Sequence, residues 1–215
     1  MSDVVGLTGA MSSGKTVTSI SLLKYYHDQG KRIISNHKLR GIPHKYLNSE
    51  DFVKFIIENY NNQAKIEDNF FNSVVFIDEA RGLYSARRSM TNLAEITTSF
   101  IFMLSKLSCD FLYTTQLLQS QIDLQLRSIT THLLECERVN SKGFPYHGDR
   151  IGDEPVFIRI RLWRPSLINK GWTTSNKFYY FDPSPYYKYY NTREILIVNR
   201  SKIEKEQTKK GKKGQ

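Results

Sequence analysis

An eight-residue motif near the amino terminus joins a short apolar run, Val4 to Leu7, to a segment with helical spacing. Its sequence is Gly9-Ala10-Met11-Ser12-Ser13-Gly14-Lys15-Thr16, which fits the pattern G-x-x-x-x-G-K-[ST]. Glycines permit a tight turn whose backbone N–H groups, with the start of the next helix, surround phosphate oxygens. We therefore expect all eight residues to bind the phosphates of a nucleotide. Lys15 would contact the β- and γ-phosphates, and the Thr16 hydroxyl would be a ligand of Mg²⁺.

Helical and strand patterns alternate over roughly the first 120 residues of the 215. Apolar runs predict strands, and spacings of three and four residues predict helices. Besides the strand before the motif, strands are expected at 31–36, 73–77 and 111–115, and helices at 16–29, 50–60 and 93–108. This order predicts an α/β fold in which helices cover both faces of a parallel sheet, with ligands at the carboxyl ends of its strands.

The pattern changes after Thr130, where Gly, Pro and Asn separate short strand-like runs. These runs lie at 131–139, 156–164, 176–181 and 194–198, and we expect them to add antiparallel strands to the same sheet. We expect a single domain over residues 1–199, with a parallel core over about 3–138 and an antiparallel extension over about 139–199. Residues 200–215 are expected to form a basic, disordered tail.

An acidic pair, Asp78-Glu79, follows the continuous apolar run Ser73 to Ile77. A carboxylate at the carboxyl end of a buried strand can hold magnesium, and a second one beside it can activate the attacking water. We assign Asp78 to the metal and Glu79 to the role of general base or water-positioning group. An ordinary acidic pair at the start of a helix is the alternative interpretation.

The strand predicted after the long helix closes with Thr114-Thr115-Gln116. In a parallel sheet this strand can lie beside the strand that precedes the phosphate-binding motif, which would place Gln116 near the γ-phosphate or the attacking water. A glutamine exposed at the end of a strand fits the residues equally well. The sequence pattern alone leaves both interpretations open.

The net charge is +10, because 31 Lys and Arg residues face 21 Asp and Glu residues. Seven positive and two negative side chains lie in Arg200 to Gln215 alone. A basic surplus favours a polyanionic partner, although a basic tail can also serve only solubility. The loops Lys142 to Arg150 and Asn169 to Trp172 are further candidates for contacts with nucleic acid phosphates. The cluster Tyr186 to Tyr190 could stack on bases, but it is expected to pack in the core or between subunits. Trp163 is expected to lie in the core.

No apolar run approaches the ~18 residues that cross a bilayer. We therefore expect a cytoplasmic protein without a membrane anchor. Cys109 and Cys136 lie far apart in apolar surroundings, so we expect two buried, reduced thiols and no zinc site.

Taken together, Gly9 to Thr16, Phe-Ile-Asp78-Glu79-Ala80 and Leu-Tyr-Thr-Thr-Gln116 resemble the FtsK/HerA superfamily of P-loop motors, which have the RecA-like (ASCE) fold. Within it, the chain is similar in size and character to the genome-packaging NTPases of archaeal icosahedral viruses. The resemblance covers roughly residues 3–138, and it supports a sensor role for Gln116. It implies an ATP- and Mg²⁺-dependent ring of six or five subunits that moves double-stranded DNA into a viral capsid. A capsid or portal vertex protein is then a further partner, and the virion a further location.

Members of that superfamily use an arginine from a neighbouring subunit to stabilise charge on the transferred phosphoryl group. This chain departs from the usual pattern, because Ser105-Lys106-Leu107 offers only a lysine where relatives often carry arginine. Arg87, Arg88 and Arg127 are the other candidates, and Arg127 is favoured because a helix after the sensor strand can face the next subunit. A contact with a nucleic acid phosphate, or a solvated charge, is an equal alternative for each.

Other classes of protein share parts of these motifs. Gly9 to Thr16 and Ile-Asp-Glu-Ala also resemble thymidine kinases, although two distant cysteines cannot build the zinc site of those enzymes. Assembly or export ATPases of the zonula occludens toxin type share the same ATPase core, and a transmembrane helix typically anchors them. A purely structural DNA-binding module is the third alternative, and it would have no need of a phosphate loop with paired acids.

Overall fold

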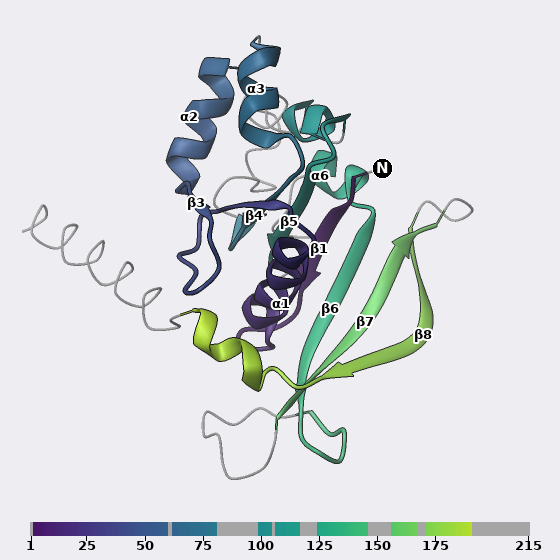
Figure 1. Ribbon diagram of the computed structural model, residues 1–215. Helices are drawn as coiled ribbons and strands as arrows, with labels where there is room; N and C mark the ends of the chain where they lie inside the picture. Colours follow the sequence, from purple (N-terminus) through teal and green to yellow (C-terminus); the bar gives the residue numbers. More distant parts are fainter. Residues whose placement is uncertain are drawn as a thin grey trace, which may run out of the picture.

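The computed structural model describes residues 2–59, 62–80, 99–104, 106–116, 124–145, 156–166 and 171–190. In these residues a single sheet runs through the molecule in the strand order β3-β2-β4-β5-β1-β6-β7-β8 (Figure 1). The strands are β1 (Val4–Thr8), β2 (Arg32–Ser35), β3 (Lys45–Tyr46), β4 (Ser73–Ile77), β5 (Asp110–Thr114), β6 (His132–Val139), β7 (Phe157–Pro165) and β8 (Trp172–Phe181). Neighbours from β3 to β6 pair in parallel, and β6, β7 and β8 pair antiparallel. The predicted α/β class with an antiparallel extension is confirmed.

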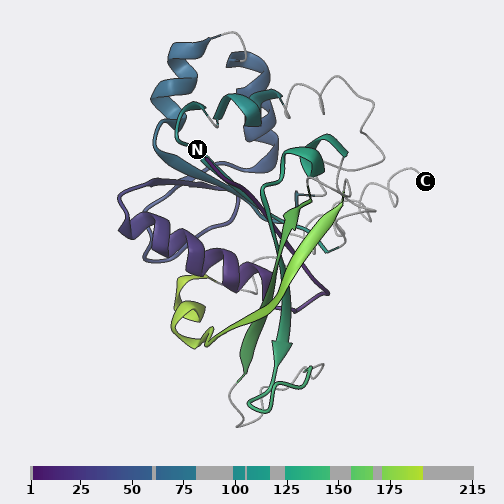
Figure 2. The ribbon, with the colours of Figure 1, turned by 90° about the vertical axis from the view of Figure 1, so that its right-hand side faces the viewer.

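Helices cover both faces of the parallel part. They are α1 (Lys15–Asp28), α2 (Ser49–Asn59), α3 (Gln63–Phe70) and α6 (Leu124–Ile129), together with helical residues at 99–104. Figure 2 shows α1 on the same side of the sheet as the 3-10 helix η3 (Ser184–Tyr189). Alternate residues of each buried strand point to opposite faces, so that Val74 and Phe76 pack toward α1 whereas Val75 and Ile77 pack toward the other helices. The sheet is therefore buried on both faces, as its continuous apolar runs predict.

The strand β5 lies between β4 and β1. It pairs with β1 from Val4↔Phe111 to Leu7↔Thr114 and with β4 from Val74↔Asp110 to Ile77↔Tyr113. The expectation that this strand lies beside the one preceding the phosphate-binding motif is confirmed. The carboxyl ends of β1, β4 and β5 consequently meet at one edge of the sheet.

The structure differs from the sequence prediction in β6. This strand pairs in parallel with β1, from Val5↔His132 to Thr8↔Glu135, which agrees with the parallel core expected over about 3–138 but not with the expectation of an antiparallel strand for the run at 131–139. The helix α6 precedes β6 and lets the chain return to the same end of the sheet before it enters the strand. Antiparallel pairing begins only with β7.

Three short elements were not predicted: β3, α3 and η3. In α3 only Ile66 and Phe70 are buried, and the helix begins where the Asn62 side chain accepts a hydrogen bond from the backbone N–H of Lys65. So few apolar residues give a weak helical pattern. Of the helix predicted over 93–108, residues 99–104 are helical, and residues 93–98 lie outside the described part of the chain. The runs at 194–198 and 200–215 also lie outside it, so the extent of the domain and the state of the tail stay predictions.

The tyrosines near the end of the described chain pack against the core beneath α1. Tyr186, Tyr189 and Tyr190 are partly buried against that core, and Trp163 is partly buried against the core on the other face. The expected packing in the core is confirmed for these residues, whereas Tyr187 is exposed. Cys109 and Cys136 are buried free thiols, as expected.

Candidate nucleotide-binding site

The loop Gly9–Gly14 connects the end of β1 to the start of α1, as the motif predicts. Gly9 and Gly14 have φ angles of 141° and 95°, which favour glycine. A Cβ on Gly9 would lie 2.4 Å from the carbonyl oxygen of Cys136, and one on Gly14 would lie 2.3 Å from Cδ1 of Ile158. The loop therefore fits only with glycine at both positions. The first turn of α1 holds no acidic residue, which leaves its N–H groups suited to an anion.

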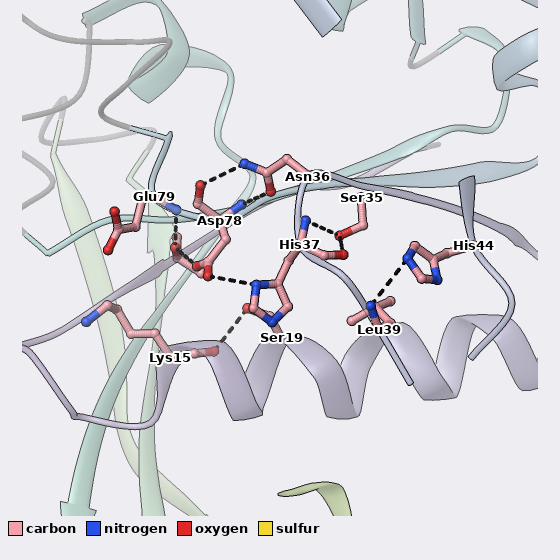
Figure 3. Close-up of polar contacts among 10 residues, drawn as sticks. Lys15, Ser19, Ser35, Asn36, His37, Leu39, His44, Asp78 and Glu79 are labelled. Atoms are coloured by element: carbon pink, nitrogen blue, oxygen red, sulfur yellow. Dashed lines mark hydrogen bonds and ion pairs between the residues drawn. The ribbon is translucent and has the colours of Figure 1, made fainter. Parts of the chain in front are cut away.

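Lys15 folds back over this loop. Its Nζ donates hydrogen bonds to the carbonyl oxygens of Gly9, at 2.9 Å, and Ala10, at 2.7 Å. Burial lowers the pKa of Lys15, and the neighbouring thiol and carboxyl groups of Cys136, Asp78 and Glu79 oppose that shift. The ammonium group therefore lies within the electrostatic reach of both predicted acids, and Figure 3 shows the three side chains gathered at one place.

The acidic pair follows β4 directly, in a turn held from the side of β5. The hydroxyl of Thr114 donates to Oδ1 of Asp78 over 2.6 Å, and it accepts a hydrogen bond from the backbone N–H of Glu79 over 2.8 Å. Glu79 has a φ of 53°, the left-handed region, and it is exposed, whereas Asp78 is largely buried. Thr114 therefore holds both the carboxylate of Asp78, which is assigned to the metal, and the left-handed backbone of Glu79.

The turn is also held from the side of β2. The side-chain amide of Asn36 accepts from the backbone N–H of Asp78 at 2.7 Å and donates to the carbonyl oxygen of Asp78 at 3.0 Å (Figure 3). Nδ1 of the buried His37 lies 3.8 Å from Oδ2 of Asp78. Neither Asn36 nor His37 was predicted as a site residue, and Thr114 was noted only as a neighbour of Gln116. A polar residue directly after a strand at the ligand-binding edge is the sequence signal that points to Asn36.

Gln116 lies two residues beyond β5 and is partly buried. Its carbonyl oxygen accepts a hydrogen bond from the Thr8 hydroxyl over 3.3 Å, at the start of the phosphate-binding loop. The structure thus brings Gln116 to the edge that carries Lys15, Asp78 and Glu79. Its role as a sensor stays a prediction.

The donor chemistry at this edge fits Mg²⁺. Magnesium in nucleotide sites takes one or two protein ligands and completes its shell with phosphate and water oxygens. The Thr16 hydroxyl, in the first turn of α1, and the Asp78 carboxylate supply oxygen donors of that kind. Within the described ranges, no cluster of three or more His, Cys, Asp or Glu side chains is placed to hold a metal ion.

The structure separates Arg127 from this site. Arg127 belongs to α6, which ends at Ile129 shortly before β6 begins beside Val5, so the helix leads into the amino end of the parallel strands. The phosphate-binding loop follows their carboxyl end. A role of Arg127 at the nucleotide of its own chain therefore has no structural support. Arg87 and Arg88 lie outside the described residues.

A glycine-bounded loop on β1, an acidic pair on β4 and a strand inserted between them define a P-loop NTPase fold. The chain belongs to the zonular occludens toxin (Zot) family, whose sequence pattern it matches over residues 4–147. Comparison with curated protein sequences finds no significant match.

Solved structures share this fold at low sequence identity. The N-terminal domain of zonular occludens toxin from Neisseria meningitidis is 18% identical with a TM-score of 0.59, and the match covers 89% of this chain and all of that one. The genome-packaging NTPase B204 of Sulfolobus turreted icosahedral virus 2, in complex with ATP-γS, is 11% identical with a TM-score of 0.53 and covers 80% of this chain and 96% of its own. B204 of Sulfolobus turreted icosahedral virus, the DNA-packaging ATPase, is 13% identical with a TM-score of 0.50.

The family match differs from the resemblance that was expected first. The P-loop NTPase fold expected from the motifs is present, but the family that the chain matches is Zot, which had been an alternative to the viral packaging NTPases. In the part of the chain that the structure describes, no helix has the length and apolar character to span a membrane.

Proposed function

We propose that this protein binds ATP and hydrolyses it with Mg²⁺. The observation that carries the proposal is the meeting of Lys15, Asp78 and Glu79 at one edge of the sheet, with Thr114 between the strands that bring them there. The structural neighbour B204 has been solved with ATP-γS, and also with AMPPCP, which supports a nucleotide as the ligand of this fold.

Each residue has a distinct task in this proposal. The loop Gly9–Gly14 and the Lys15 ammonium bind the triphosphate through N–H donors and positive charge. Thr16 and Asp78 would hold Mg²⁺, which draws charge from the phosphate oxygens. Glu79, exposed beside Asp78, accepts a proton from the attacking water or orients it. Gln116 would contact the γ-phosphate or that water.

We further propose that the protein works as a ring of five or six subunits that uses ATP to move double-stranded DNA, with a capsid or portal vertex protein as a further partner. The fold shared with B204, a DNA-packaging ATPase, and the basic surplus of the sequence support this proposal. In such a ring Arg127 or Arg88 of a neighbouring subunit would stabilise the transferred phosphoryl group. The cytoplasm of a host cell or a virion is the expected location.

Membership in the Zot family favours a second function, that of an ATPase that drives assembly or export. The chemistry at the nucleotide is the same in both cases. The two functions differ in what the motor acts on, and DNA dependence therefore separates them.

The test is the ATPase rate of the purified protein, measured with and without added duplex DNA over a range of protein concentrations. If the protein is a ring that moves DNA, the ATPase rate per subunit should rise with added duplex DNA and with protein concentration. Hydrolysis that rises with protein concentration but ignores duplex DNA would favour the assembly or export function. If ATP is not hydrolysed under any of these conditions and thymidine is phosphorylated instead, the proposal is wrong and the kinase alternative is correct.

A further inference from the structure

Asn36 occupies the point where the pairing of β2 with β4 gives way to side-chain contacts. The ladder between these strands runs from Arg32↔Ser73 to Ser35↔Phe76, and the backbone N–H of Asn36 donates to the carbonyl oxygen of Phe76 over 3.2 Å. The side-chain amide of the same Asn36 then makes two hydrogen bonds to the main chain of Asp78, two residues beyond Phe76. The side chain thus extends the strand pairing to the first acid of the site.

This two-bond contact restrains the direction of both acids. An amide that donates to the carbonyl oxygen and accepts from the N–H of one residue fixes the peptide planes on both sides of that residue. Thr114 holds the next N–H, that of Glu79, from the side of β5. Because Asn36 bonds to the main chain of Asp78, it neutralises neither carboxylate. It can therefore orient the acids while leaving their charge for Mg²⁺ and water.

The loop that carries Asn36 is itself anchored at several points. Within it, the Ser35 hydroxyl donates to the carbonyl oxygen of His37 over 2.8 Å and accepts from the N–H of His37 over 2.9 Å. Farther along, the backbone N–H of Arg40 donates to the carbonyl oxygen of Tyr189 over 2.7 Å, at the end of η3. The loop that begins at Asn36 is therefore anchored to β2 at one end and to Tyr189 farther along, and an anchored support of this kind is what a precise site requires.

We propose that Asn36 is a positioning residue for ATP hydrolysis, which sets the Asp78–Glu79 turn so that one acid faces the metal and the other faces the attacking water. This inference rests on the proposed function. Nucleotide binding by Gly9–Lys15 does not involve β2, so the loss of Asn36 should reduce turnover and metal binding while the affinity for metal-free ATP stays the same. A residue that serves only folding would lower stability and change none of these kinetic quantities selectively.

The test compares Asn36→Leu, which keeps the approximate volume and removes both hydrogen bonds, with Asn36→Asp, which keeps the acceptor and removes the donor. Small misplacements of reacting groups cost up to about 100-fold in rate. We expect kcat to fall about 10- to 100-fold in both variants, while the affinity for ATP measured without divalent metal changes by less than about twofold. Asn36→Asp also keeps the shape of the side chain, so it serves if Asn36→Leu does not fold.

A matched control is Asn48→Leu, because the Asn48 side chain also accepts a backbone hydrogen bond, from the N–H of Asp51 over 2.8 Å, at the start of α2. This variant should lower the unfolding temperature and leave kcat per folded protein unchanged. An unchanged kcat in folded Asn36→Leu or Asn36→Asp, beside an active wild-type enzyme, would overturn the inference and leave the proposed function intact.

A second measurement does not depend on turnover. Mn²⁺, used in place of Mg²⁺ with ATP-γS, should bind the Asn36→Leu variant at least about tenfold more weakly in electron paramagnetic resonance titrations, whereas a fluorescent ATP analogue without divalent metal should bind equally. If the wild-type protein hydrolyses no ATP, the proposed function fails, and this titration still decides the role of Asn36. Equal Mn²⁺ affinity in wild type and Asn36→Leu would refute it.

Discussion

The ammonium of Lys15 lies 2.9 Å from the carbonyl oxygen of Gly9, the residue that opens the same loop. A second hydrogen bond, to Ala10, completes a contact between the end of the motif and its beginning. A phosphate that binds this ammonium must replace neutral carbonyl acceptors with charged ones, and charge-assisted hydrogen bonds are the stronger kind. The loop thus presents its lysine already folded toward the place where phosphate oxygens bind.

Replacing Lys15 by alanine should weaken ATP binding. Hydrogen bonds to charged groups contribute about 1.5–3 kcal/mol, which corresponds to a loss of affinity of at least about tenfold. Titration with a fluorescent ATP analogue measures the change. Lys24→Ala provides the control, because Lys24 pairs with Asp28 farther along the same helix. Equal affinity in Lys15→Ala and wild type would contradict the assignment of the loop.

Glu79→Gln should bind ATP normally and fail to hydrolyse it. The amide keeps the size of the side chain but cannot accept the proton of water, and a general base contributes about 10²- to 10⁴-fold to a rate. Single-turnover hydrolysis of radiolabelled ATP, alongside equilibrium binding, separates the two steps. Glu58→Gln on the exposed part of α2 should behave as wild type. Full turnover by Glu79→Gln would remove Glu79 from the role of base.

Gly14→Ala should destabilise the fold more than the same change at another glycine with positive φ. Strain at a φ of 95° and the contact of the new Cβ with Ile158 together cost about 2–5 kcal/mol. Gly30 has a φ of 80° and open space around the position of a Cβ. Gly30→Ala should therefore lower the free energy of unfolding only by the backbone strain, about 1–2 kcal/mol. Urea unfolding followed by circular dichroism measures both.

The double variant Gly14→Ala/Ile158→Ala tests the source of that cost. Relative to Ile158→Ala alone, the added Gly14→Ala change should cost about as much as Gly30→Ala, because the opposing side chain is gone. If Gly14→Ala lowers the free energy of unfolding equally with and without the Ile158 side chain, the contact between the loop and β7 does not restrict residue 14.

Neither thiol should react in the folded protein near neutral pH. Burial raises the pKa of Cys109 and of Cys136 from 9.0 to about 12, which keeps both in the unreactive thiol form. Alkylation by iodoacetamide at pH 8, followed by mass spectrometry, should find both unmodified in native protein and both modified in urea. Because the unfolded thiols release protons near pH 9 and the folded ones only near pH 12, these groups make the fold less stable as pH rises through that interval. Rapid labelling of native protein would contradict their burial.

A trans role of Arg127 can be tested by mixing subunits. Arg127→Ala should lower kcat without weakening ATP affinity, because the arginine would act on the nucleotide of a neighbouring subunit. Mixing Arg127→Ala with inactive Lys15→Ala should restore part of the activity, since some interfaces then join an intact loop to an intact arginine. Unchanged turnover in Arg127→Ala alone would exclude the role.

The motif residues were predictable because each is required by the conformation of its own short segment of chain. Gly9 and Gly14 need positive φ, and Asp78 directly follows an uninterrupted apolar strand, so both features can be identified along the chain. Asn36 could not be assigned in the same way, because its partner Asp78 is 42 residues away and only the pairing of β2 with β4 brings them together. The direction of β6 could not be predicted from the local sequence pattern either. Side chains alternate between the two faces of a sheet in the same way whether a strand runs parallel or antiparallel to its neighbour.

The amino-acid sequence by itself determined the phosphate-binding loop, the acidic pair and the α/β alternation, because these depend on backbone conformation and apolar periodicity within a few residues. Only the tertiary structure decided that β5 separates the loop from the acids, that Thr114 and Asn36 hold Asp78 from two sides, and that Arg127 lies away from the nucleotide edge of its own chain. Such relations arise from strand order and register, which long-range packing selects and short segments do not encode.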